Sequence, residues 1–307
     1  MLNPRGLPPG RENTSMIPDY PDTVEFSIDL REKLHPMFQK LAEGISEFTF
    51  ANLYLFRREH NYRFTRMDQE CPVILGDDKG ISFFMCPFGL PSQASLNTLF
   101  DTHGILKCAT TSQAEQLKEK GLTVTQDRDN FDYIYSRESL ADLSGRKYHK
   151  KRNLIKAFIN NHAYEGRPLL DEFIPQALDV LDQWREARQD DGDYHAAREA
   201  LERCDPLQLC GGIYYVENKP VAYTLGEELA LGTSFVIHFE KALNEYKGIY
   251  QFVNQAFATI ITDHYQSINR EQDLGNPGLR QAKMSYKPDS FVEKFKITRP
   301  GDIVKNI

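Results

Sequence analysis

The sequence predicts a fold of the α/β (α+β) class, built from two α/β halves. Short runs rich in β-branched and aromatic residues alternate with segments whose apolar residues recur at helical spacing. The chain has 307 residues, which is enough for two domains. Hydrophobic residues make up 40% and charged residues 26%, as in ordinary soluble globular proteins. We therefore expect packed sheets and helices rather than a disordered chain.

The first half is expected to span residues 19–145, after a flexible tail at residues 1–18 that is rich in proline, glycine and arginine. Apolar residues at helical spacing predict a helix over residues 29–44. The remaining elements expected in this half are strands at 62–67, 71–75, 80–88 and 106–111, a helix at 112–121 with Ser112 as its cap, and a strand at 130–137. These elements make one α/β unit.

The second half is expected to span residues 146–307 and to carry the functional site. A basic run, RKYHKKRNLIK, leads into its first helix. The elements that follow are helices at 171–188 and near 195–203, a hairpin at 211–229, a strand at 233–242, a helix at 245–265, a strand at 265–269, a short helix at 276–286 and a strand at 291–298. No sequence repeat relates the two halves.

Composition limits the class of function. The net charge of −7 argues against a general binder of polyanions, although a local basic patch is compatible with it. The five cysteines are odd in number and form no C-x-x-C, so we expect reduced thiols in a cytoplasmic protein, with neither a disulfide framework nor a zinc site. No apolar run approaches the roughly 20 residues that span a bilayer, so membrane contact is expected to be at most peripheral.

Four strings resemble one protein family: SEFTFANLYLFR, RKYHKKRNLIKAF, VIHFEKALNEYKGIYQFVNQAF and NREQDLGNPGLRQAKMSYKP. They are similar to the soluble family related to the carboxy-terminal domain of phosphatidylglycerol lysyltransferase. The resemblance implies two GNAT-like folds in tandem, each a mixed, mostly antiparallel sheet flanked by helices. It also implies transfer of an acyl or aminoacyl group, because relatives with this fold move aminoacyl groups from charged tRNA to lipids or peptidoglycan precursors.

Two departures from the family change the expected substrates. The lysyltransferases carry a long transmembrane portion that has no counterpart in this sequence, so their lipid substrate does not carry over. The acetyl-CoA loop of GNAT enzymes, Q/R-x-x-G-x-G/A, is replaced by NEYKGIYQ with the single glycine Gly248. This weakens coenzyme A binding, but Lys247 and Gly248 at a helix start remain candidates for holding a cofactor phosphate.

Acyl transfer requires a base for the nucleophile and donors for an oxyanion. Strict alternation on strand 233–242 places Phe235, Ile237 and Phe239 on one face, and His238 and Glu240 on the other. His238 or Glu240 is therefore a candidate base, or a group that holds the acceptor amine. An ion pair on a half-exposed strand is the structural alternative.

The stretch from 269 to 288 supplies the other candidates. Glu271 and Asp273 are expected to bind a substrate ammonium, together with Asn254 from the preceding helix. Arg280 and Lys283 lie three residues apart on a helix and suit a phosphate, a carboxylate or a developing oxyanion. Lys283 resembles a lysine of the tandem-fold aminoacyl transferases. An internal salt-bridge network that closes a loop on a helix explains these charges equally well.

Two further sets of residues complete the prediction. Tyr286 is a candidate proton donor to the leaving group. Lys147, Lys150, Lys151 and Arg152 are candidates for binding RNA phosphates or a nucleotide, with a solvated helix face as the alternative. No third ligand accompanies the His-x-Glu pattern, so no metal is expected.

The sequence therefore predicts an acyl or aminoacyl transferase that acts on an amine or hydroxyl acceptor, either a small molecule or lipid-derived. Aminoacyl-tRNA is the preferred donor, and no cofactor is firmly indicated. The alternatives are an acyl-CoA-dependent N-acyltransferase and a non-catalytic ligand-binding protein of the same fold. The prediction depends on side chains near residues 238, 271 and 283 converging on one cavity.

Overall fold

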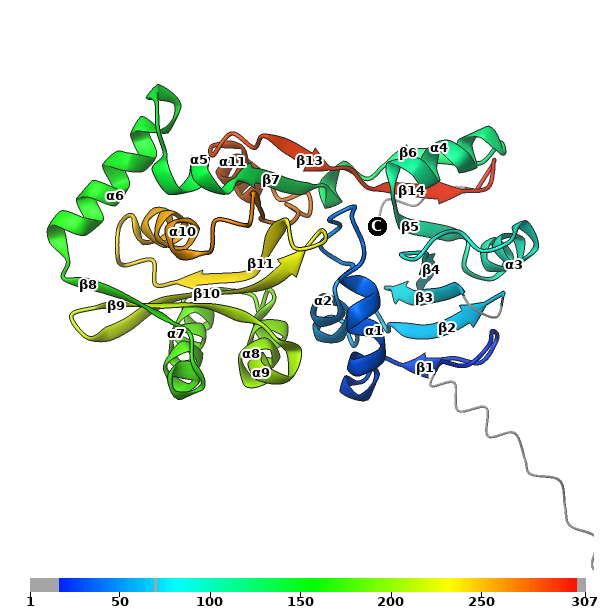
Figure 1. The fold of residues 1–307 in the computed structure, drawn as a ribbon, viewed down its shortest axis with the longest axis horizontal. Helices are drawn as coiled ribbons and strands as arrows, with labels where there is room; N and C mark the ends of the chain where they lie inside the picture. Colours follow the sequence, from blue (N-terminus) through cyan, green and yellow to red (C-terminus); the bar gives the residue numbers. More distant parts are fainter. Residues whose placement is uncertain (1–16, 69–70, 303–307) are drawn as a thin grey trace, which may run out of the picture.

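The computed structural model describes residues 17–68 and 71–302, so the tail expected over residues 1–18 lies almost entirely outside the described residues. Two mixed sheets of seven strands each lie side by side, with helices on their faces (Figure 1). The predicted fold class is thereby confirmed. No helix in the described ranges has the length and apolar character needed to cross a membrane.

The first sheet has the order β1-β2-β3-β4-β5-β14-β6. All its neighbouring strands are antiparallel except β4 and β5. Its strands are β1 (Val24–Glu25), β2 (Arg63–Met67), β3 (Cys71–Asp78), β4 (Ile81–Met85), β5 (Ile105–Ala109), β6 (Thr123–Gln126) and β14 (Phe295–Thr298). The helices beside it are α1 (Arg31–Phe38), α2 (Phe50–Leu55), α3 (Gln93–His103) and α4 (Thr111–Glu119).

The second sheet has the order β13-β7-β12-β11-β10-β9-β8, and its one parallel pair is β11 and β12. Its strands are β7 (Asp132–Ser136), β8 (Tyr164–Pro168), β9 (Cys210–Val216), β10 (Lys219–Leu229), β11 (Ser234–Ala242), β12 (Ser267–Asn269) and β13 (Ser290–Val292). Its helices are α5 (Arg137–Asp142), α6 (His149–Asn161), α7 (Ile174–Glu186), α8 (Tyr194–Glu202), α9 (Cys204–Leu207), α10 (Ile249–Ile260) and α11 (Pro277–Met284).

The two sheets exchange strands. β7 follows the first-half strands in the chain but pairs with β12 and β13, whereas β14, near the end, pairs with β5 and β6. The single strand expected over 291–298 is therefore wrong, because that stretch forms β13 and β14 in different sheets. The expected boundary between residues 145 and 146 does not separate the strands of one sheet from those of the other.

Local signals explain most element bounds and one error. α4 is capped by Thr110 and not by the expected Ser112, since the Thr110 hydroxyl accepts from the Gln113 amide and the Gln113 side chain accepts from the Thr110 amide. In the predicted hairpin the turn lies at Glu217 and Asn218, one residue before the expected Asn218 and Lys219, and both turn residues have positive φ, as a two-residue turn of this kind requires. α3 was not predicted.

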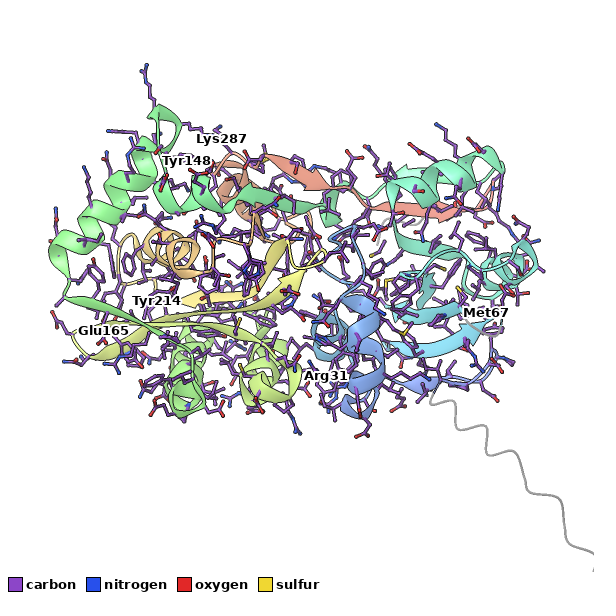
Figure 2. The ribbon with its side chains drawn as sticks, in the orientation of Figure 1. Arg31, Met67, Tyr148, Glu165, Tyr214 and Lys287 are labelled. Carbon is purple, nitrogen blue, oxygen red and sulfur yellow. The ribbon has the colours of Figure 1, made fainter. Side chains whose placement is uncertain are left out.

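A single apolar core joins the two halves. It runs from α1 and α2 to α7, α8 and α9 beneath the second sheet, and includes Leu34, Phe50, Leu181, Ala200 and Phe239. A separate cluster packs α10, α5 and α6 on the other face of that sheet. Side chains fill both faces, and Tyr214, labelled in Figure 2, belongs to this second cluster. The second sheet is thus covered on both faces, and α10 lies over the candidate site.

Candidate functional site

A β-bulge at His238 decides which side chains of β11 share a face. Leu225 of β10 pairs with Phe239, but the next residue, Gly226, pairs with Ile237, so His238 is the extra residue. Phe239 packs in the core shared by the two halves, whereas Phe235 and Ile237 pack on the α10 face. The prediction that these three residues share one face is wrong, because a bulge reverses the alternation.

The same bulge separates His238 from Glu240. Glu240 lies opposite Thr224. Thr224 is two residues from Ala222, which packs on the α10 face, so Thr224 and Glu240 lie on that face too. His238 instead reaches Glu227, which lies on the other face of β10. His238 and Glu240, which were expected on one face of the strand, therefore lie on opposite faces and have different partners.

His238 is held between two carboxylates and is buried. Its Nδ1 lies 2.7 Å from an oxygen of Glu271, and its Nε2 lies 3.0 Å from an oxygen of Glu227. Burial alone would lower the pKa of His238, but these hydrogen bonds and the two negative charges raise it to about 10. An imidazolium has no lone pair that accepts a proton, so this geometry suits a buried ion pair better than a general base.

The loop that follows β12 is fixed by Lys283. Its ammonium donates to the backbone carbonyls of Arg270, Glu271 and Gln272, at 2.5, 3.1 and 2.6 Å. Burial lowers the pKa of Lys283 to about 8. An ammonium group has three N–H donors, and three acceptors use them. Lys283 therefore fixes the loop, and its ammonium has no remaining N–H to donate to an oxyanion.

Asp273 and Arg280 close the same loop on α11. The Arg280 guanidinium donates to both oxygens of Asp273 and also bonds Asp129 at 2.6 Å. The Tyr133 hydroxyl donates to Asp273 at 2.5 Å. Burial raises the pKa of Asp273, but these hydrogen bonds outweigh it and hold the pKa at about 2. The charges of this loop thus form the internal network that the sequence offered as the alternative.

Unsatisfied polar groups occur elsewhere, where β11 and β12 part. The two strands pair only as far as Val236 and Asn269. Beyond this point β11 continues, whereas the backbone after β12 enters the loop. We call the place where they part the strand splay. The Arg270 guanidinium spans the splay and bonds Glu240 at 2.8 Å. The second oxygen of Glu240 is buried and has no hydrogen-bond partner among the described residues. A buried carboxylate oxygen without a donor marks a place where a ligand or water is needed.

Three other side chains lie around this carboxylate. The Arg270 guanidinium is 5.5 Å from the centre of the Tyr286 ring, and the Lys151 ammonium is 3.9 Å from the same centre. Burial raises the pKa of Tyr286, so its hydroxyl keeps a proton at neutral pH, as a proton donor requires. We call Lys151, Glu240, Arg270 and Tyr286 the splay cluster.

Asn254 is a second unsatisfied group. It lies on α10, is 1% exposed, and neither atom of its amide has a hydrogen-bond partner within the described parts of the chain. A buried amide without partners costs roughly 1–3 kcal/mol. Such a cost is unusual for a residue whose role is only packing, and it is compatible with the expected role in substrate binding.

The basic run divides into three kinds of residue. Lys147 and Lys150 are exposed. Arg152 donates to the carbonyls of Leu143 and Gly145 and so secures the end of α5. Lys151 is half-buried and turned toward Tyr286. The structure thus leaves Lys147 and Lys150 as the solvent-facing part of the expected phosphate-binding group.

The candidate cofactor loop is covered by α6. Gly248 caps α10 with φ of 93°, and a Cβ there would lie 2.4 Å from the carbonyl oxygen of Leu154. The glycine is therefore needed for the close approach of α6. Since α6 backbone lies against this helix start, the geometry argues against a pyrophosphate at Gly248. Lys247 beside it is exposed.

Residues of the first half hold the loop from the other side. The Asn52 amide donates to Glu271 at 3.4 Å, the Ser46 hydroxyl to Gln272 at 3.3 Å, and the Asn269 amide to the Gly44 carbonyl at 3.0 Å. Sequence reasoning missed these partners, because nothing in the sequence pairs residues more than 200 positions apart. It also missed Arg270, although this residue lies in the charged stretch that drew attention.

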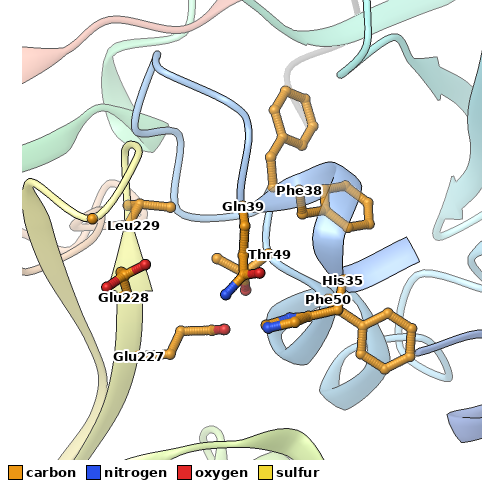
Figure 3. A pocket seen from close by; sticks show the side chains of 10 residues that line it. His35, Phe38, Gln39, Thr49, Phe50, Glu227, Glu228 and Leu229 are labelled. Atoms are coloured by element: carbon orange, nitrogen blue, oxygen red, sulfur yellow. The ribbon is translucent and has the colours of Figure 1, made fainter. Parts of the chain in front are cut away.

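A small cavity lies between the halves, where α1 meets the end of β10 (Figure 3). Figure 3 shows His35 of α1 and Glu227 of β10 pointing toward one another. His35 Nε2 is buried and has no hydrogen-bond partner among the described residues. The free space is about 10 Å³, enough for about one water molecule, so a bridging water fits here and a substrate does not.

A larger cavity of about 590 Å³ lies in the first half, next to the ends of β4 and β5. None of the predicted site residues lines it. Across residues 17–68 and 71–302, no three His, Cys, Asp or Glu side chains are grouped to hold a metal ion.

The proposal that side chains near residues 238, 271 and 283 share one cavity is not what the geometry provides. Glu271 bonds His238, and Lys283 bonds the backbone of Glu271, so the three do meet. They meet as a bonded network, whereas Glu240 and Asn254 keep buried atoms without a hydrogen-bond partner among the described residues.

Solved structures of other proteins superpose on most of this chain. A conserved protein of unknown function from Bacteroides thetaiotaomicron superposes with a TM-score of 0.81 at 29% identity, covering 90% of this chain and 99% of that one. L-PGS from Bacillus licheniformis superposes with a TM-score of 0.62 at 15% identity, covering 94% and 95%.

A curated relative adds a sequence match without a function. An uncharacterized protein of Mycoplasmoides gallisepticum is 22% identical over 175 residues, which is 53% of this chain and 54% of that protein. The matched part of the chain thus spans about half the length of this relative.

The family assignment rests on most of the chain. Residues 38–298 match the family described as phosphatidylglycerol lysyltransferase, C-terminal, and this range includes the bulge, the splay cluster and both sheets except β1. The chain therefore belongs to the family of the phosphatidylglycerol lysyltransferase C-terminal domain and folds as two GNAT-like units in tandem.

Proposed function

We propose that the protein is an aminoacyltransferase whose site is the strand splay of the second sheet. It transfers an aminoacyl group from aminoacyl-tRNA to an amine or hydroxyl acceptor. Membership of a family described as a lysyltransferase supports the reaction class. The single observation that carries the location is the buried, unpartnered oxygen of Glu240, held in place by Arg270.

Glu240 has the geometry of a base and of an amine ligand. Its Oε1 is fixed by Arg270, so Oε2 stays free to accept a hydrogen bond from the acceptor N–H or O–H. In the transfer, the acceptor nitrogen or oxygen bonds the ester carbonyl carbon and loses its proton to Glu240. The bond to the ribose oxygen then breaks, and this oxygen takes a proton, for which Tyr286 is the donor. Tyr286 regains a proton from solvent or from Glu240.

The choice of donor rests on α6. The Leu154 carbonyl lies against Gly248, where a coenzyme A pyrophosphate would need free backbone amides. The exposed Lys147 and Lys150 on or beside the same helix offer cations to RNA phosphates instead. Both observations favour tRNA over an acyl-CoA donor.

The test is a transfer assay with the purified full chain. A mixture of radiolabelled aminoacyl-tRNAs is incubated with a panel of amines and hydroxyl compounds, and acyl-CoAs are offered in a parallel arm. We expect acceptor-dependent loss of label from tRNA and a labelled product. Glu240→Gln should lower turnover about 100-fold or more, as for loss of a general base. Glu245→Gln, at an exposed carboxylate, is the matched control.

Other outcomes have defined meanings. Turnover with acyl-CoA alone would replace the donor but keep the site. Wild-type turnover by Glu240→Gln would remove Glu240 from the reaction. Binding of charged tRNA or amines without turnover, read as a rise in melting temperature, would favour the non-catalytic protein of the same fold.

A further inference from the structure

The cations around the splay differ in whether they have partners. Lys283 is bonded to three carbonyls. Arg280 is bonded to Asp273 and Asp129. Arg270 is bonded to Glu240. Lys151 contacts only an aromatic ring, with no carboxylate or carbonyl acceptor for its ammonium among the described residues.

Lys151 is also unlike its neighbours on the basic run. Lys147 and Lys150 are exposed, and Lys147 lies 4.9 Å from the ring centre of Tyr148. Lys151 is half-buried and lies closer, 3.9 Å, to the ring centre of Tyr286, which belongs to the chain just after α11. An ammonium drawn out of water without an acidic partner is costly, and a π-face offsets only part of that cost.

The charges around it do not balance. The groups that face Lys151 are the Arg270 guanidinium and the Tyr286 phenol, and the Glu240 carboxylate lies beyond them on Arg270. The one carboxylate is thus bonded to Arg270, and Lys151 has no negative charge of its own among the described residues. Burial and the charge of Arg270 lower the pKa of Lys151 to about 8, so part of the ammonium is lost just above neutral pH. A bound anion would restore both the charge balance and the protonated state.

We propose that Lys151 is the phosphate-binding residue of the splay. Its ammonium binds one phosphate group of the donor, while Arg270 remains bonded to Glu240. This inference rests on the proposed function, because it deepens the binding of that donor. The sequence offered Lys151 for phosphate as one of four basic residues, and the inference singles it out as the one that binds at the splay, in place of Lys283 and Arg280, which are bonded to the loop. Lys147 and Lys150, by contrast, supply only screened attraction at the surface.

The test reads the ammonium itself and needs no turnover. Lysines of the full chain are reductively methylated with ¹³C-formaldehyde, and the Lys151 signal is assigned by its loss in Lys151→Arg. The pH titration of that signal is measured alone and with pyrophosphate. We expect a midpoint near 8 that moves upward with pyrophosphate.

Variants measure the contribution to affinity. Lys151→Met should weaken pyrophosphate binding about tenfold or more, since a hydrogen bond to a charged group is lost. Lys151→Arg should keep most of the affinity, and Lys150→Met, the matched exposed control, should change it less than twofold. A short RNA oligonucleotide and coenzyme A, compared as competitors, identify which donor supplies the phosphate.

The outcomes separate the two proposals. A pyrophosphate-insensitive Lys151 signal, or unchanged affinity in Lys151→Met, overturns the inference even when transfer activity is present. A Lys151-dependent phosphate site in a protein without transfer activity keeps the inference and overturns the proposed function. Equal loss of affinity in Lys151→Met and Lys150→Met reduces the site to surface charge and also overturns the inference.

Discussion

Two buried charge clusters in this protein differ in how completely they are paired. Between the halves, Lys294 is fully buried and forms ion pairs with Glu47 and with Asp132, the second at 2.8 Å. At the strand splay, Glu240 keeps one oxygen without a donor, and Lys151 has no acidic partner in the part of the chain that the structure describes. The closed cluster joins the sheets, and the open cluster leaves groups for a ligand.

The difference has a physical cause. A buried charge is tolerated when partners satisfy it, and removing one partner is costly. The closed cluster links the segment between β13 and β14 to β7 and to the first half, so it stabilises the exchange of strands. In the open cluster, burial of the Glu240 oxygen costs desolvation free energy that a hydrogen bond from a ligand or water would offset. Stability and binding are therefore located in different places, and substitutions should separate them.

The largest effect is expected at the closed cluster. Lys294→Met should lower the free energy of unfolding by about 3–5 kcal/mol, because Glu47 and Asp132 would remain buried beside each other without a cation. Urea unfolding of the variant and of the control Lys150→Met, at an exposed lysine, would measure it. A loss below about 1 kcal/mol would show that the cluster does not join the halves.

His238 offers a test of a closed cluster next to the open one. Its pKa is raised to about 10, so the stability that it adds is fully present below the unfolded value near 6.5 and is lost as pH rises toward 10. His238→Gln should therefore cost about 3 kcal/mol at pH 6 and less at pH 10. Urea unfolding at pH 6, 8 and 10 would give the difference between wild type and variant. A difference that is constant with pH contradicts the charged state.

Asn254, the buried amide on α10 without hydrogen-bond partners among the described residues, should respond in the opposite sense. Asn254→Leu replaces an amide without partners by an apolar group of similar size, so we expect a gain of about 1 kcal/mol in stability. The same change should weaken transfer or donor binding. Asn153→Leu, at an exposed position of α6, is the control and should change stability within about 0.5 kcal/mol. Destabilisation by Asn254→Leu would mean that the amide is satisfied in the native state.

The smallest structural effect is expected at the surface. Replacing Lys147 and Lys150 by Gln should leave stability within about 0.5 kcal/mol, because both side chains are exposed. The slope of log affinity for tRNA against log salt should become shallower by about 1.5, for two lost phosphate contacts. The same exchange at Lys118 and Lys120, exposed in the first half, should leave the slope unchanged. Equal slopes in the wild type and in both double variants would show that tRNA does not bind at Lys147 and Lys150.

Local patterns carried much of the fold. The apolar spacing of the helix at α10 and the strand-forming runs of β2, β9 and β10, bounded by turn residues, gave elements close to the observed ones, since each depends on residues a few positions apart. The stretch 269–288 was correctly identified as a dense charge cluster. Within that stretch, Lys283 and Arg280, which the sequence assigned to a substrate, are bonded to the loop itself.

The errors share one origin. The bulge at His238 shifts the register by one residue, and periodicity cannot detect it, because counting residues along a strand assigns faces by strict alternation whether or not a bulge is present. The split of 291–298 into two sheets has no local signal either, because Lys294 is explained only by Glu47 and Asp132, which lie far away in the chain.

Residue patterns were enough to predict the class of the fold, the order of most elements, the family and the residue types available for acyl transfer. Which of those residues have hydrogen-bond partners became clear only from the folded arrangement. Propensity and periodicity act over a few residues, whereas the burial and pairing of a charge depend on groups from different elements, such as Glu47 and Asp132 around Lys294. Glu240 and Lys151 are candidates because, among the described residues, one oxygen of Glu240 has no hydrogen-bond donor and the Lys151 ammonium has no acceptor.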